Sequence, residues 1–160
     1  MNPAPDFDLD AEQQLAGMIL RHEDVADDIL QAVAADSFLN YGCRTVVELA
    51  AALRREGKPC APAAVRIAAR EAGKLPDFES NAGGFTALLV ELHEQASTSV
   101  GWEHYAAKVN SKAAIRNLRR AAEQLLHECD SPTATPAEIA ANHARAVEDA
   151  VADRTAGELT

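Results

Sequence analysis

Aromatic side chains are scarce in this chain. Phenylalanine, tyrosine and tryptophan make up 4% of its 160 residues, although 48% of the residues are hydrophobic. Strands are enriched in aromatic and β-branched side chains, whereas the apolar surface here comes mainly from alanine, the residue with the highest helix propensity. The shortage of aromatics and the abundance of alanine therefore predict an all-α fold.

Positive charge is also in short supply. The chain carries 15 lysines and arginines against 25 aspartates and glutamates, which gives a formal net charge of -10 at pH 7. Such a charge opposes broad attraction to the phosphate backbone of nucleic acid or to an anionic membrane surface. We therefore expect neither tight direct binding of nucleic acid nor association with a membrane.

Patterns that hold metals, nucleotides or disulfides are missing from the sequence. It has no C-x-x-C pair, no H-E-x-x-H and no H-x-x-x-H, so we expect no metal and no disulfide framework. It also lacks G-x-x-x-x-G-K-[ST] and G-x-G-x-x-G, so we expect no nucleotide cofactor. No apolar run approaches the roughly 20 residues that cross a bilayer, and the first residues are acidic where a signal peptide would be basic. These absences indicate a cytoplasmic protein without a cofactor.

Two residues leave an enzymatic alternative open. Cys43 adjoins Arg44, whose charge lowers a thiol pKa in the right setting, and His93 adjoins Glu94. Neither residue has a visible catalytic partner, and a free cysteine usually behaves as a small buried hydrophobe. We therefore predict no catalytic residue.

Apolar residues recur at helical spacing along most of the chain, as in the set Leu15, Met18 and Ile19, which follows the possible N-cap residues Asp8 and Asp10. From about residue 99 the character changes to two long alanine-rich helices, roughly 99–128 and 136–153. We predict a disordered arm over 1–8, a globular multi-helix head over 9–97, a long α-hairpin over 98–154 and the start of a linker over 155–160.

The predicted hairpin carries two local signals. Its second helix opens with Thr135-Pro136-Ala137-Glu138, which has the spacing of a capping box with proline at the first helical position. The first helix carries an apolar seam at 3-4-3 spacing, made of Ile115, Leu118, Ala122 and Leu125. Such a seam requires another helix, supplied either by the head or by a second copy of the chain.

A row of cations runs along the same helix at every fourth position, through Lys108, Lys112, Arg116 and Arg120. Like charges at this spacing repel each other, so the row is either a solvated stripe or it faces an acidic surface on a partner. The chain itself has acidic residues near its start that could serve, namely Asp6, Asp8, Asp10, Glu12, Glu23, Asp24, Asp27 and Asp28. The row and the short helices also suggest a small helix-turn-helix DNA-binding protein, but the net acidity argues against that alternative.

Four segments, in this order, resemble a known family. They are "DAEQQLAGMIL", "DSFLNYGCRTVVELAAALRREGKP", "AGGFTALLVEL" and "YAAKVNSKAAIRNL". The chain resembles, over about Leu9 to Arg154, the N-terminal domain of the bacterial replicative DNA helicase, the DnaB-type hexamer. Cys43, Ala61 and Ala87 depart from the family pattern, which prefers histidine, aspartate and tyrosine at these positions.

The resemblance implies a helical head with a protruding α-hairpin. It further implies that hairpins pair between subunits as dimers or a trimer of dimers, in a collar where primase and possibly a helicase loader dock. The residues expected at the self-association or partner interface are Trp102, Tyr105, Val109, Arg116, Leu118, Leu125, Ile139 and Val147, with Lys108, Lys112 and Arg120 as charged partner contacts. The chain shows no ATPase motor, so we predict either the collar domain of a helicase or a free-standing domain that binds helicase or primase.

Overall fold

The computed structural model describes residues 5–155, with side chains through residue 152. No strand occurs in this part of the chain, so the predicted all-α class is confirmed. Residues 1–4 of the expected arm and residues 156–160 of the expected linker lie outside the described residues. The helices are α1 (Leu9–Arg21), α2 (Glu23–Ala32), η1 (Ala35–Ser37), α3 (Tyr41–Arg55), α4 (Pro62–Glu71), η2 (Leu75–Phe78), α5 (Gly84–Gln95), α6 (Trp102–Asp130) and α7 (Pro136–Thr155).

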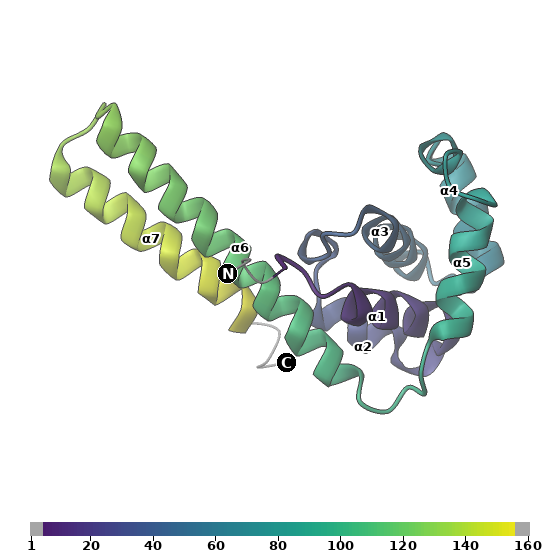
Figure 1. Ribbon diagram of the computed structural model, residues 1–160. Coiled ribbons are helices and arrows are strands. Elements are labelled where there is room, and N and C mark those ends of the chain that lie inside the picture. The colour runs from purple at the N-terminus through teal and green to yellow at the C-terminus, as the bar shows by residue number, and fades with distance from the viewer. Residues whose placement is uncertain (1–4, 156–160) are drawn as a thin grey trace.

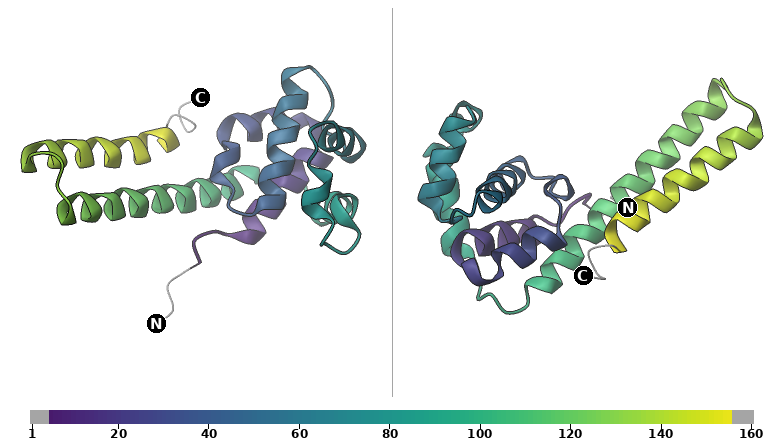
Figure 2. Two further views of the ribbon diagram at one scale, coloured as in Figure 1. Left: turned by 90° about the horizontal axis from the view of Figure 1, so that it is seen from above. Right: turned by 180° about the vertical axis from the view of Figure 1, so that it is seen from behind.

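The molecule has a globular end and an extended end (Figure 1). Helices α1 to α5 gather into the head, and α6 runs out from it to pair with α7. Figure 2 shows from two further sides that α6 and α7 lie side by side and antiparallel, and that their far ends stand clear of the head. The hairpin therefore presents most of its length away from the head.

Helix α1 is the centre of the head. It contacts α2, α3, α5 and α6, and the side chains expected on its inner face, Leu15, Met18 and Ile19, are buried. The surrounding helices add Phe38, Val46, Val65, Leu89 and Leu92 to the same core. One apolar cluster built around a central helix is enough to hold five short helices together, because burial of each such side chain contributes about 1.5–3 kcal/mol.

Side-chain caps begin α1 and α7 at positions that the sequence indicates. Asp8 Oδ1 accepts a hydrogen bond from the Ala11 amide at 3.0 Å, which starts α1. At α7 the expected capping box is confirmed: the Thr135 amide donates to Glu138 Oε2 at 2.8 Å, and the Glu138 amide donates to Thr135 Oγ1 at 3.3 Å. These local bonds satisfy backbone donors that the first helical turn leaves unpaired.

Glu12 corrects one expectation from the sequence. We placed it among the surface acids, but its side chain is 1% exposed. Its two carboxylate oxygens accept hydrogen bonds from the amides of Leu39 and Asn40, each at 2.8 Å. Residues 39 and 40 lead directly into α3, so Glu12 joins the central helix to the start of another helix. The expectation was wrong because charge pattern alone cannot reveal a long-range backbone partner.

Candidate assembly interface

The first turns of α6 belong to the packing of the head. Val109 is 1% exposed and lies in the head's core together with Ala106, while Trp102 and Tyr105 pack against that core and are half-buried. The side chain of Val109 is thus covered within the chain. Trp102, Tyr105 and Val109 were expected at an interface with another copy, but in this chain they face its own head.

The hairpin is closed by small and medium side chains. Ala121 on α6 and Ile139 and Ala150 on α7 are buried, and α6 and α7 pack closely along their length. Leu118, Leu125 and Val147 are half-buried on the same two helices. Part of the apolar seam is therefore used inside the hairpin.

The other two residues of the seam are open: Ile115 is 48% exposed, and Ala122 is exposed as well. Two further apolar residues of the hairpin that are not in the seam are also exposed, Leu126 at 65% and Val151 at 46%. At 100° per residue, positions 115, 122 and 126 fall within about 40° of one another around α6, and Arg119 stands at the edge of this side. We call this side, with the neighbouring groove described next, the apolar face of the hairpin.

A shallow groove of about 510 Å³ continues the apolar face toward the end of the hairpin. Both helices contribute to it, and nearly all of its lining is apolar. The residues are Leu125, Cys129, Pro132, Pro136, Ile139, Ala140, His143 and Ala144. Two of the predicted interface residues, Leu125 and Ile139, thus lie together in this groove.

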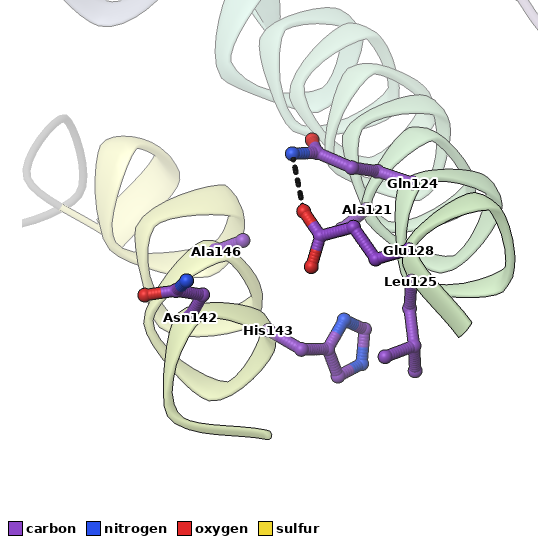
Figure 3. A pocket seen from close by; sticks show the side chains of 7 residues that line it. All are labelled: Ala121, Gln124, Leu125, Glu128, Asn142, His143 and Ala146. Atoms are coloured by element: carbon purple, nitrogen blue, oxygen red, sulfur yellow. Dashed lines mark hydrogen bonds between the residues drawn. The ribbon is translucent and has the colours of Figure 1, made fainter. Parts of the chain in front are cut away.

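Another small cavity between the two helices has a more polar lining (Figure 3). There Gln124 Nε2 donates to Glu128 Oε1 at 3.1 Å, Asn142 stands on the facing helix, and the His143 ring lies between the helices near Leu125. The cavity measures only about 30 Å³, which is room for little more than a water molecule. This cavity is too small for a ligand. Of these two hollows on the hairpin, the apolar groove is therefore the candidate binding surface.

The cation row is paired within the chain. Lys112 Nζ donates to the Pro5 carbonyl at 2.9 Å, Arg116 donates to the Asp6 carbonyl at 2.7 Å and to the Ser37 carbonyl at 2.6 Å, and Lys108 lies 3.9 Å from the Asp8 carboxylate. Arg120 makes a long contact of 3.4 Å with Asn117 Oδ1 on its own helix. Three of the four cations thus contact residues 5–8, but two of them bind backbone carbonyls there, whereas Lys108 lies near an acidic side chain.

Arg119 is a member of this group that the sequence analysis missed. It forms an ion pair and hydrogen bond with the Asp6 carboxylate, and this bond is the main cause that lowers the pKa of Asp6. The signal was available, because Arg119 follows Lys112 by seven residues and so returns to the same side of the helix after two turns.

Cys43 lacks the environment of a reactive thiol. Burial raises its pKa to about 12, with a further contribution from the charge of Glu12. The Arg44 side chain is directed to the backbone of the preceding segment, where its Nε donates to the Phe38 carbonyl at 2.8 Å. Among residues 5–152, no group of three or more histidine, cysteine or acidic side chains is placed to hold a metal ion. None of the helices described here is long and apolar enough to cross a membrane.

Thiol labelling tests this description of Cys43. In folded protein near neutral pH, we expect a maleimide to modify Cys129, which is exposed, and to leave the buried Cys43 and Cys60 unmodified. In denaturant all three should react, as counted by mass spectrometry. Faster modification of Cys43 in the folded protein than in denaturant would contradict the assignment and revive a cysteine-based activity.

Comparison with known proteins bears on the whole arrangement. The model of the DnaB-like helicase N-terminal domain matches residues 4–111 of the chain. The chain belongs to this family. Among solved structures, the N-terminal domain of DnaB helicase from Mycobacterium tuberculosis matches with a TM-score of 0.80 and 23% sequence identity, over 91% of this chain and 99% of that one. No match was found among curated proteins.

The two comparisons overlap but differ in how much of the chain they cover. The family match ends at residue 111, within α6, and so includes the head and the first turns of the hairpin. The structural match covers a larger share of the chain and shares the helical fold. The apolar face lies almost entirely after residue 111, where the likeness is one of fold.

Proposed function

We propose that this DnaB-type domain assembles the subunits of a replicative DNA helicase through the apolar face of its hairpin, and that it has no ATPase activity of its own. The observation that carries this proposal is the apolar face itself, because it lies on an element that extends away from the head. A domain whose only task was to fold would gain nothing from it.

A second copy of the chain is the proposed occupant of the apolar face. Helix seams of this kind bury themselves against another helix, and a two-fold arrangement lets the same face serve on both subunits. Leu125, Ile139 and Val147 would contribute beside the more exposed Ile115 and Leu126. Trp102, Tyr105, Val109 and Arg116 would act indirectly, since they attach the base of the hairpin to the head.

Primase and possibly a helicase loader are the further partners that we propose, docking on the assembled domains. Alternatively, this chain is a free-standing domain that binds a helicase. It would then bind through the same apolar face, by packing of helix against helix. The helix-turn-helix alternative has less support, because Lys112, Arg116 and Arg119 already donate to the chain's own start.

Charge placed on the apolar face tests assembly. We expect Leu126→Glu and Ile115→Glu each to weaken self-association at least tenfold, or about 1.4 kcal/mol, because the carboxylate would lose its water in the interface. Both side chains are exposed within one chain, so the fold should survive. Leu118→Glu is a less clean test, because Leu118 is half-buried on the hairpin itself.

Asn142→Asp is the matched control, since it adds the same charge at an exposed position beside the polar cavity (Figure 3). Sedimentation equilibrium of the unsubstituted protein, Leu126→Glu, Ile115→Glu and Asn142→Asp gives the dissociation constants. If Leu126→Glu and Ile115→Glu associate as tightly as Asn142→Asp, the apolar face is not the assembly interface.

A further inference from the structure

The segment Pro5–Asp8, which we call the arm, lies beside the middle of α6 (Figure 1). It precedes α1, and its first two residues make polar contacts with one stretch of α6, residues 112–119. Lys112 and Arg116 bind the backbone carbonyls of Pro5 and Asp6, and Arg119 pairs with the Asp6 carboxylate. Side chains of α6 thus bind two kinds of acceptor on the arm, its backbone carbonyls and a carboxylate.

This stretch is where α6 leaves the head. Before it, α6 is anchored by the buried Val109 and by Asn110 Nδ2, which donates to the Ala32 carbonyl at 3.0 Å. Ala113 is buried near the start of the stretch, and after the stretch α6 packs against α7, where Ala121 is buried. With 29 residues the helix is about 44 Å long, so a small change of direction at its middle displaces the far end considerably.

Charge contributes more than close packing to the attachment of the arm. A groove of about 480 Å³ remains between the arm and α6, lined by Pro5, Phe7, Asp8, Leu9 and Lys112. Arg119 and Asp6 are both about half exposed, and exposed ion pairs are weak and sensitive to salt. Contacts of this kind can open while the core of the head stays folded.

The attachment also relieves repulsion within α6. Lys108, Lys112 and Arg116 stand at successive i,i+4 positions, where like charges destabilise a helix. Asp6 and Asp8 bring negative charge to this row, and both carbonyl contacts direct partial negative charge at it. When the arm dissociates, the cations of the row again repel one another, at the position where the hairpin leaves the head.

We propose that the arm is a releasable electrostatic strap that sets the direction in which the hairpin leaves the head. Closed, it holds residues 112–119 against the start of α1. Open, it lets the hairpin change direction relative to the head without unfolding either part.

Spin-label distances between head and hairpin test the strap. Labels are placed at Ala63→Cys on α4 and Thr133→Cys in the hairpin loop, in a Cys129→Ser background in which Cys43 and Cys60 remain buried. Dilution with unlabelled protein restricts the measurement to pairs within one chain. The strap predicts a narrow distance distribution for this labelled protein at low salt.

Asp6→Asn and Arg119→Gln should each broaden that distribution, because the hairpin would then be free to move about the head as a hinged element. The double variant should be no broader than either single variant, because both remove the same pair. Asp10→Asn is the matched control: it removes an equal charge from an exposed position in the first turn of α1 and should leave the width unchanged. In about 1 M salt the Debye length falls to about 3 Å. The labelled protein with Asp6 and Arg119 intact should then give a distance distribution as broad as that of the variants.

Circular dichroism during the same experiments checks that every variant remains folded. The proposal is overturned if Asp6→Asn and Arg119→Gln keep the narrow distribution, or if Asp10→Asn broadens it equally. It is also overturned if the effects of the two single variants add in the double variant, since the two residues would then act separately.

Discussion

Glu12→Ala is expected to lower the free energy of unfolding by about 4 kcal/mol. Hydrogen bonds to a charged group contribute about 1.5–3 kcal/mol each, and Glu12 accepts two of them from the Leu39 and Asn40 amides. The carboxylate is 1% exposed, so its removal also leaves these amides without a nearby replacement from solvent. Glu12→Gln keeps one acceptor oxygen and should lose about half as much.

Glu48→Ala is the control for this experiment, because Glu48 is exposed on α3 and its loss should change stability by no more than about 0.5 kcal/mol. Urea unfolding followed by circular dichroism gives all three values. If Glu12→Ala unfolds at the same urea concentration as Glu48→Ala, the buried carboxylate does not hold the head together.

Gly17→Ala is expected to destabilise the head by up to about 3 kcal/mol, the upper range for overpacking of a core. A Cβ at this position of α1 would lie 2.2 Å from the Leu92 carbonyl oxygen, and 3.0 Å from the Ala96 Cβ. Because the nearest atom belongs to the backbone of α5, relief requires a shift of a whole helix. The gain in helix propensity from glycine to alanine, about 1 kcal/mol, is too small to compensate.

Gly42→Ala is the matched comparison. Its added Cβ would meet the Leu88 Cδ2 at 2.9 Å, which is the end of a flexible side chain that can turn away. We therefore expect Gly42→Ala to change stability by less than about 1 kcal/mol, measured by the same urea titration. Equal losses at both positions would mean that close approach of α1 and α5 is not the limiting constraint.

The effect of Glu12 on stability also concerns the hairpin, through a short junction formed by residues 37–40. Glu12 binds the amides at its end, Arg44 binds the Phe38 carbonyl, and Arg116 binds the Ser37 carbonyl. Side chains from α1, α3 and α6 thus meet on the same few backbone groups. Loosening the junction at Glu12 would also loosen one attachment of α6, so head stability and hairpin direction are physically linked.

Most of the fold could be predicted from the sequence. Alanine content and helical periodicity indicated an all-α chain, and Asp8 and the Thr135 to Glu138 box marked helix starts that the structure reproduces. Such signals are local: a cap acts within one turn, and periodicity reports only that a helix has an apolar side. The order of the four family-like segments added the family, which the match over residues 4–111 bears out.

Only the tertiary structure decided how the faces of those helices are shared. The spacing of apolar residues along α6 could not reveal that Val109 packs into the head, that Leu118 is half-buried on the hairpin, and that Leu126 remains exposed. The cation row likewise could not reveal that Arg119 pairs with Asp6, more than a hundred residues earlier in the chain. A helix repeats every 3.6 residues and so defines its sides from sequence alone, but which partner covers each side depends on contacts between distant segments that exist only in the folded chain.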